Sequence, residues 1–131
     1  MATILIIDDN SVMRKLLEKY IGGQEEYKTV TADDGTSGIE KAIRPDGDLP
    51  DLIITDVLMP DMNGFEVAKA LKANKKTKDI PIIFVTANSD EKSKAMAREA
   101  GGAGYIAKPF HKEDILACIK EHLLLFPSIS Q

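Results

Sequence analysis

The sequence predicts an open α/β fold, in which five parallel strands form one doubly wound sheet with helices on both faces. Three observations predict it. Short apolar segments alternate along the chain with segments whose apolar residues recur at helical spacing. The connections between them are only a few residues long, which favours right-handed crossovers between parallel strands. Five such units within 131 residues fit an open sheet better than a closed barrel, which needs roughly 250 residues.

Five segments have the length and composition of strands. The first and third are apolar runs rich in isoleucine, which stop at Asp8 and Asp56. The fourth is equally apolar, and runs of this kind are typical of strands buried on both faces of a parallel sheet. In chain order, the strands are predicted over residues 2–7, 28–32, 52–55, 80–85 and 104–107.

Each predicted strand is followed by a predicted helix. In the first helix, Val12 and Leu16 are among the apolar residues at helical spacing. We expect Ser11 to cap its start, and Gly22 with Gly23 to end it. The second helix is predicted to be short and weak, and the fourth is rich in alanine. In chain order, the helices are predicted over residues 12–21, 38–43, 65–73, 89–100 and 112–125.

Composition excludes several classes of protein. The 17 basic and 21 acidic side chains leave a net charge of −4, so there is no overall electrostatic footprint for nucleic acid. A single cysteine forms neither an internal disulfide nor a multi-cysteine zinc site, and no apolar stretch reaches the roughly 18 residues of a membrane span. The apolar N-terminal run is interrupted by acidic residues from Asp8 onward, so it does not predict a signal peptide. We expect one cytoplasmic domain over residues 1–131, with a core over about 3–125 and a tail over 126–131.

Polar side chains follow four of the predicted strands, at the point where each strand ends. Asp8 and Asp9 follow the first strand, Asp56 the third, Thr86 the fourth, and Lys108 the fifth. In an open parallel sheet, ligands bind outside the carboxyl ends of the strands, near the point where the strand order reverses. We therefore expect these five side chains to meet in one shallow pocket.

The chemistry of this set indicates phosphoryl transfer. Carboxylates that lie close together raise each other's pKa values, and Mg²⁺, which prefers oxygen ligands, relieves the repulsion. Lys108 adds a positive charge and Thr86 a hydroxyl donor where a phosphoryl group would lie. Asp8 and Asp9 could instead cap the first helix, and on their own that would be the better interpretation. The presence of the whole set favours a site.

Four sequence segments carry a family resemblance: ILIIDD at 4–9, LIITDVLMPDMNG at 52–64, PIIFVTA at 81–87 and GYIAKPF at 104–110. Together, in this order and each at a strand end, they resemble the receiver domain of two-component response regulators over residues 3 to about 125. They are similar to the stand-alone, chemotaxis-type regulators that consist of this domain alone. The resemblance implies the flavodoxin-like (βα)5 receiver fold and a signalling switch in place of an enzyme.

The resemblance also implies a role for each site residue. Asp56 would be the phospho-acceptor, and a magnesium ion would be held by Asp8, Asp9, Asp56 and the backbone carbonyl of Leu58. Lys108 and Thr86 would contact the phosphoryl oxygens, and the bond between Lys108 and Pro109 would be cis.

The resemblance further implies a conformational switch and the partners that use it. Thr86 and Tyr105 would move on phosphorylation, and the face formed by the fourth helix, the fifth strand and the fifth helix would change for a downstream target protein. Leu58 and Asn88, each two residues beyond a key residue, would tune a slow self-hydrolysis. The donor would be a sensor histidine kinase or a histidine phosphotransfer protein; direct binding to nucleic acid or to a membrane is not expected. Gly102 departs from the alanine that is usual in the family, and we expect it to loosen the entry into the fifth strand.

Three other functions stay open. An aspartyl-phosphate phosphatase would also use a strand-end aspartate, but it would carry a second acid two residues after its first-strand nucleophile, where this chain has Asn10. A flavodoxin-like flavin carrier would have a first loop rich in Ser, Thr and Gly in place of Asp8 and Asp9. A receiver domain could also act purely as an unphosphorylated docking module.

Overall fold

The computed structural model describes residues 1–45, 47–88 and 90–125, so the predicted tail over 126–131 lies outside the described residues. Within these ranges, the five predicted strands form one parallel sheet in the order β2-β1-β3-β4-β5. The strands are β1 (Ala2–Ile7), β2 (Tyr27–Ala32), β3 (Leu52–Asp56), β4 (Ile82–Thr86) and β5 (Gly104–Ala107). The predicted α/β fold, with its flavodoxin-like order of strands, is confirmed.

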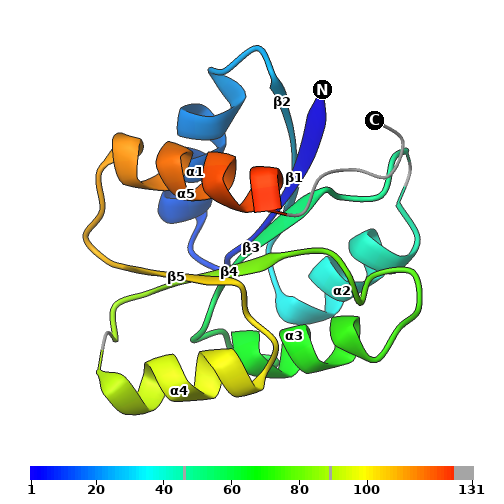
Figure 1. Cartoon of the computed structure of the whole chain (residues 1–131), viewed down its shortest axis with the longest axis vertical. Coiled ribbons are helices and arrows are strands. Elements are labelled where there is room, and N and C mark those ends of the chain that lie inside the picture. The colour runs from blue at the N-terminus through cyan, green and yellow to red at the C-terminus, as the bar shows by residue number, and fades with distance from the viewer. Residues whose placement is uncertain (46, 89, 126–131) are drawn as a thin grey trace.

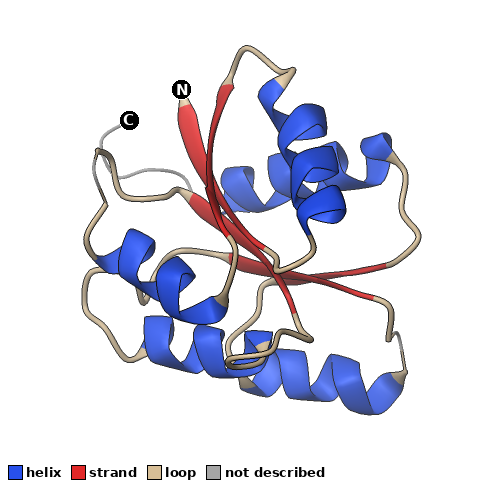
Figure 2. Ribbon diagram, turned by 180° about the vertical axis from the view of Figure 1, so that it is seen from behind, coloured by secondary structure: helices blue, strands red, loops and turns tan. Residues whose placement is uncertain are grey.

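The five helices of the described residues cover both faces of this sheet (Figures 1 and 2). They are α1 (Ser11–Gly22), α2 (Gly35–Ile43), α3 (Gly64–Lys72), α4 (Glu91–Glu99) and α5 (Lys112–Leu125). Helices α1 and α5 pack on one face and the other three on the opposite face (Figure 1). Such a three-layer arrangement buries both faces of each central strand.

Alternation along the strands divides the core into two clusters. Ile4 and Ile6 of β1 pack toward α1 and α5, whereas Leu5 and Ile7 of the same strand pack toward α2 and α3. All four side chains are 0% exposed, as expected for a central strand whose side chains alternate between two covered faces.

No helix among the described residues is long and apolar enough to cross a membrane.

Four of the five helices begin one to three residues away from their predicted starts, and the differences at α1 and α2 have a clear cause. Asn10, not Ser11, caps α1, because its side-chain Oδ1 accepts hydrogen bonds from the backbone N–H groups of Val12 (3.0 Å) and Met13 (3.1 Å). Helix α2 begins at Gly35, three residues before the predicted start at Gly38. Its first turn is rich in glycine and small polar residues, whose helix propensity is low. The sequence therefore does not predict this turn, which is stabilised by contacts with other segments.

Candidate functional site

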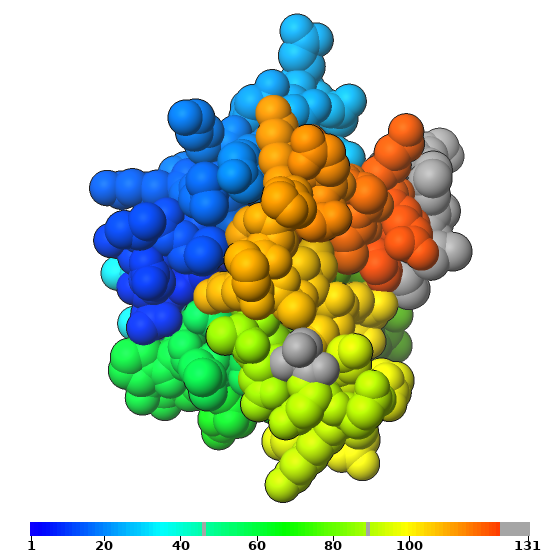
Figure 3. Space-filling view, turned by 90° about the vertical axis from the view of Figure 1, so that its left-hand side faces the viewer, coloured from blue at the N-terminus to red at the C-terminus, as the bar shows by residue number. Residues whose placement is uncertain are grey.

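The register of the sheet brings the predicted polar side chains to one edge. Ile7 pairs with Thr55, so Asp8 and Asp56 follow at neighbouring strand ends. Asp56 pairs with Val85 and Thr86 pairs with Ala107, so Thr86 and Lys108 continue the same row. Figure 3 looks onto this edge, where the dark blue start of α1, the green loop after β3 and the orange segment after β5 adjoin. Strand order reverses between β1 and β3, which is where such sheets bind ligands.

Three carboxylates form the centre of the site. One ligand oxygen from each of Asp8, Asp9 and Asp56 lies within 4.8 Å of the other two. Asp8 and Asp56 are buried, with 1% and 9% of their surface exposed, whereas Asp9 is exposed at the rim. The cluster therefore has a solvent-facing side through which a ligand can enter.

The electrostatics of Asp8 show what the cluster lacks. Its Oδ1 accepts a hydrogen bond from the backbone N–H of Asn10 (2.9 Å), but its buried Oδ2 has no hydrogen-bond partner among the described residues. Burial raises the pKa of Asp8 to about 6, and the negative charges of Asp56 and Asp9 add to this effect, while the Asn10 N–H and Lys108 oppose it. A buried carboxylate oxygen that accepts no hydrogen bond, beside two further carboxylates, fits a hard divalent cation such as Mg²⁺.

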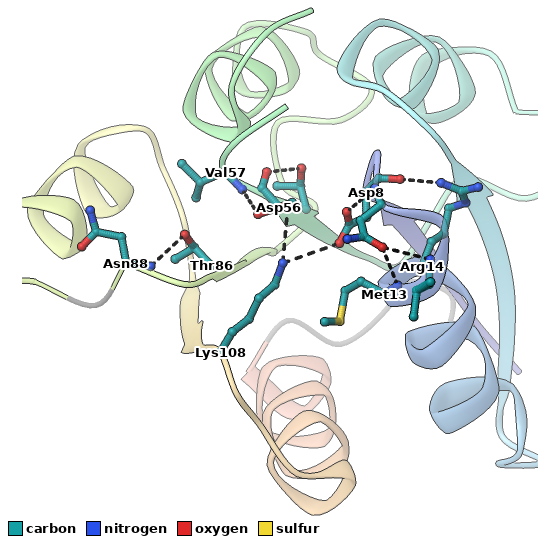
Figure 4. Close-up of polar contacts among 11 residues, drawn as sticks. Asp8, Met13, Arg14, Asp56, Val57, Thr86, Asn88 and Lys108 are labelled. Carbon is teal, nitrogen blue, oxygen red and sulfur yellow. Dashed lines mark hydrogen bonds and ion pairs between the residues drawn. The ribbon is translucent and has the colours of Figure 1, made fainter. Parts of the chain in front are cut away.

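Lys108 supplies the positive charge of the site. Its Nζ atom lies 3.5 Å from Oδ2 of Asp56 and 3.9 Å from Oδ2 of Asp8, so it points between the two strand ends (Figure 4). The side chain is one-fifth exposed. The bond between Lys108 and Pro109 is cis, as predicted.

Asp56 is held by the chain that follows it. Its Oδ1 accepts a hydrogen bond from the backbone N–H of Val57 (2.7 Å), which leaves Oδ2 facing Lys108 (Figure 4). The following loop, residues 57–63, closes where the Gly64 N–H donates to the Val57 carbonyl (2.8 Å). A Cβ atom at Gly64 would lie 2.3 Å from the Asp56 carbonyl oxygen, so this close approach requires glycine.

The predicted switch residues meet at the loop after β4. Thr86 is 1% exposed, and its hydroxyl oxygen accepts a weak hydrogen bond from the backbone N–H of Asn88 (3.3 Å; Figure 4). The Tyr105 hydroxyl donates to the backbone carbonyl of Asn88, and burial raises the pKa of Tyr105. The ring of Tyr105 packs against the core cluster on the α3 side of the sheet. Both side chains therefore contact one short loop.

The two residues expected to tune hydrolysis are both accessible. The Leu58 side chain is 71% exposed in the loop after Asp56. Asn88 is exposed as well, and its side-chain Oδ1 accepts a hydrogen bond from the backbone N–H of Asp90 (3.2 Å).

Two further residues at the site were not singled out from the sequence. The Arg14 guanidinium donates to the backbone carbonyl of Asp8 (2.7 Å) and so fixes the strand end that carries the acidic pair (Figure 4). Asp61, in the loop after Asp56, accepts three hydrogen bonds from the first turn of α2. Arg14 lies outside the segments that carry the family resemblance, whereas Asp61 lies inside the segment at 52–64 but not at its strand end. Each of the two acts through a contact with a different element.

Comparison with known proteins agrees with this geometry. A model of the response regulator receiver domain matches residues 4–120. The chain belongs to this family. Accepting a phosphoryl group is the general function of receiver domains, which work as signalling switches together with histidine kinases and downstream targets.

Several known receiver-containing proteins are similar to this receiver domain in sequence. Response regulator ArlR of Staphylococcus aureus is 36% identical over 120 residues, which are 92% of this chain and 52% of that protein. Response regulator PleD of Caulobacter vibrioides is 34% identical over 119 residues, which are 91% of this chain and 25% of that protein. The receiver domain thus spans about half or less of the length of these relatives.

Solved structures of receiver domain proteins are similar to this chain in fold as well as in sequence. Chemotaxis protein CheY4 of Vibrio cholerae superposes with a TM-score of 0.85 at 31% identity, covering 92% of this receiver domain and 98% of that chain. A CheY-like receiver domain protein of Methanospirillum hungatei superposes with a TM-score of 0.81 at 28% identity, covering 94% of both chains.

Proposed function

We propose that this receiver domain is a phosphorylation switch in which Asp56 accepts a phosphoryl group from a phosphohistidine donor. The donor is a sensor histidine kinase or a histidine phosphotransfer protein. The observation that carries the proposal is the position of Lys108, whose Nζ lies 3.5 Å from Oδ2 of Asp56 inside a cluster of three carboxylates. The single positive charge of the Lys108 ammonium does not neutralise three carboxylates, so the pocket favours binding of a cation. With the cation bound, the pocket can accept a phosphoryl group.

In the proposed transfer, a carboxylate oxygen of Asp56 attacks the phosphorus in line with the leaving imidazole. The new P–O bond forms as the P–N bond of phosphohistidine breaks, and the electron pair of that bond goes to the imidazole nitrogen. The Lys108 ammonium beside Oδ2 balances negative charge on the phosphoryl oxygens. The buried Thr86 hydroxyl is the donor that would reach the phosphoryl group from the neighbouring strand end.

The metal ligands in this proposal are the three carboxylates of Asp8, Asp9 and Asp56 together with the backbone carbonyl of Leu58. The buried Oδ2 of Asp8, which has no hydrogen-bond partner among the described residues, supports the fit, because a divalent cation would satisfy it. When bound, Mg²⁺ supplies positive charge that neutralises the phosphoryl oxygens during transfer. Asp8 and Asp9 would bind and orient the metal ion, and Asp56 alone would form the covalent bond to the phosphoryl group.

The proposed output is a change in the face formed by α4, β5 and α5. If the Thr86 hydroxyl turns to a phosphoryl group, it gives up its hydrogen bond with the Asn88 N–H. Asn88 also accepts from the Tyr105 hydroxyl, so a change in the loop after β4 reaches β5 directly. A downstream target protein would bind the face in one of its two states.

Intact-mass measurement tests the proposal. The protein is incubated with acetyl phosphate and Mg²⁺, and we expect a gain of one phosphoryl group. Asp56→Asn should show no gain, because the nucleophilic carboxylate is lost, whereas the control Asp33→Asn, at an exposed aspartate after β2, should behave as the wild type.

Removal of Mg²⁺ with a chelator should abolish the gain. A wild-type protein that gains nothing would contradict phosphorylation of Asp56 and favour the unphosphorylated docking module, and a gain that persists in Asp56→Asn would place the acceptor elsewhere. Either result would overturn the proposal.

A further inference from the structure

Asp61 joins the loop after the acceptor to a helix that precedes it in the sequence. Its Oδ1 accepts a hydrogen bond from the Gly35 backbone N–H (3.1 Å). Its Oδ2 accepts from the Thr36 backbone N–H (2.8 Å) and from the Thr36 hydroxyl (2.7 Å). The two partners lie 26 and 25 residues earlier in the chain.

These bonds complete the first turn of α2. The first four N–H groups of a helix have no partner inside the helix. In α2, Ser37 N–H donates to the Asp34 side chain (2.7 Å) and Gly38 N–H donates to the Asp34 carbonyl (3.0 Å). The N–H groups of Gly35 and Thr36 both go to Asp61. The Gly38 bond is the first regular bond of the helix, so two of the three N–H groups at residues 35–37 are capped from a different loop.

The charge of Asp61 suits this position. Hydrogen bonds from the Thr36 hydroxyl and backbone N–H lower the pKa of Asp61 to about 2, with smaller contributions from the N–H groups of Gly35 and Met62. The carboxylate is therefore ionised at neutral pH, and a negative charge at a helix N-terminus interacts favourably with the helix dipole.

The helix start and the loop are also in direct contact. A Cβ atom at Gly35 would lie 2.4 Å from Cγ of Met62 and 3.0 Å from Cγ2 of Val67, so only glycine allows this approach. Residues 57–63 are anchored at their start by the buried Val57 side chain and at their end by Asn63, the N-cap of α3. Between these anchors, Asp61 provides the polar attachment to α2.

Resting on the proposed function, we infer that Asp61 is a positioning residue for phosphorylation: by tying the loop of residues 57–63 to α2, it holds the Leu58 carbonyl in place as a metal ligand. The Leu58 side chain is 71% exposed and so does little to hold this carbonyl. Asp61 touches neither Asp56 nor a phosphoryl group in this inference; it acts through the backbone of the loop.

The test compares two aspartates that cap the same helix. Asp61→Ala removes the tie between the loop and α2, whereas Asp34→Ala removes the cap that α2 makes for itself and leaves the loop attached. Each variant is measured for Mg²⁺ affinity by calorimetry, for the initial rate of phosphorylation by acetyl phosphate, and for its melting temperature.

We expect Asp61→Ala to weaken Mg²⁺ binding by about tenfold, the low end of the range for residues that orient metal ligands, and to slow phosphorylation at subsaturating Mg²⁺. Asp34→Ala should lower the melting temperature to a similar extent, because both lose N-cap bonds, but should keep the wild-type Mg²⁺ affinity. Asp61→Asn, which keeps one acceptor oxygen, should fall between wild type and Asp61→Ala. It serves as the folded variant if the alanine variant proves too unstable.

Thr36→Val gives an independent check, because it removes one of the three bonds from the other side. Its effect on Mg²⁺ affinity should be smaller when Asp61 is already alanine, since the two side chains act as a pair. Equal Mg²⁺ affinity in wild type and Asp61→Ala, or equal losses in Asp61→Ala and Asp34→Ala, would overturn the inference.

The two proposals fail in different ways. If the wild type takes no phosphoryl group but Asp61→Ala still binds Mg²⁺ more weakly, the proposed function fails and the positioning role stands. If the wild type is phosphorylated and Asp61→Ala matches it in both measurements, the positioning role fails and the proposed function stands.

Discussion

At the scale of single residues, we expect Leu58 and Asn88 to set how long a phosphoryl group on Asp56 would last. Hydrolysis of an acyl phosphate needs a water molecule oriented toward the phosphorus, and a polar side chain at the rim can orient it. Leu58 is 71% exposed at this rim but carries no polar atom. Asn88 carries a carboxamide, but its oxygen already accepts from the Asp90 N–H (3.2 Å). The phosphorylated domain is therefore expected to be long-lived.

Leu58→Asn should shorten that lifetime. An exposed carboxamide two residues beyond the acceptor can orient the attacking water, so we expect hydrolysis to speed up roughly tenfold, less than the roughly 10²–10⁴-fold of a full acid–base group. Loss of the phosphoryl group is followed by intact mass after the donor is removed. Leu49→Asn, at a leucine that is 42% exposed outside the site, is the control and should leave the rate unchanged. A wild-type rate equal to or faster than that of Leu58→Asn would contradict this role.

At the scale of elements, the connection from α4 into β5 is tighter than the sequence suggests. We expected Gly102, in place of the usual alanine, to loosen this link. In the structure, the Gly102 N–H donates to the Ala97 carbonyl (2.9 Å) and the Ala103 N–H donates to the Ile82 carbonyl (2.8 Å). A Cβ atom at Gly102 would lie 2.4 Å from Cε2 of Phe84, a fully buried ring. The glycine makes room for this ring, so the expectation of a loose link was wrong.

Gly102→Ala should therefore destabilise the protein. Overpacking against a buried ring costs about 1–3 kcal/mol, which thermal or urea unfolding measures. The Phe84 ring packs edge-on against Phe65, with centroids 5.2 Å apart, so it has little room to move. Combining Gly102→Ala with Phe84→Leu should cost less than the two single changes added together.

Gly22→Ala is the matched control for this prediction. A Cβ atom there would meet only Thr29, at 3.8 Å, so alanine at the end of α1 should be neutral or slightly stabilising. A Gly102→Ala variant as stable as the wild type would show that the ring can shift after all.

At the scale of the whole molecule, the acidic site sets a pH dependence on folding. Asp8 has a pKa of about 6 in the folded protein against 3.8 as a free side chain, chiefly because it is buried. The folded state therefore binds this proton more tightly than the unfolded state between these two values. The free energy of unfolding of the metal-free protein should fall as the pH rises through this window, by on the order of 3 kcal/mol from this group.

Asp8→Asn should remove this pH dependence, because the amide carries no proton to lose and the buried charge is gone. In a chelator above pH 6, we expect the variant to be more stable than the wild type. Added Mg²⁺ should stabilise the wild type by binding the folded state alone, and should stabilise Asp8→Asn much less. Urea unfolding at a series of pH values measures both effects. Asp33→Asn should keep the wild-type profile, and a metal-free Asp8→Asn less stable than the wild type at neutral pH would refute the prediction.

The sequence by itself determined the order and type of the elements and the edge at which the polar residues gather. Apolar runs such as residues 2–7 must be buried on both faces, and short crossovers make the strands parallel. The residues that end these strands, among them Asp8, Asp56 and Lys108, then lie at one edge whatever the details of packing. Strand burial and strand direction are local or nearly local properties, so a pattern along the chain is enough to predict them.

Only the tertiary structure decided which contacts hold that edge in its final geometry. The early start of α2, the three bonds to Asp61, the Arg14 bond to the Asp8 carbonyl and the fit of Gly102 against Phe84 each depend on contacts between different segments of the fold. A helix start that is capped by neighbouring residues can be predicted from a local sequence pattern, as at Asn63 and Glu66. A helix start that is capped by a distant loop has no such pattern in its own sequence. These contacts follow from how the elements pack against one another, and packing is a property of the folded chain as a whole.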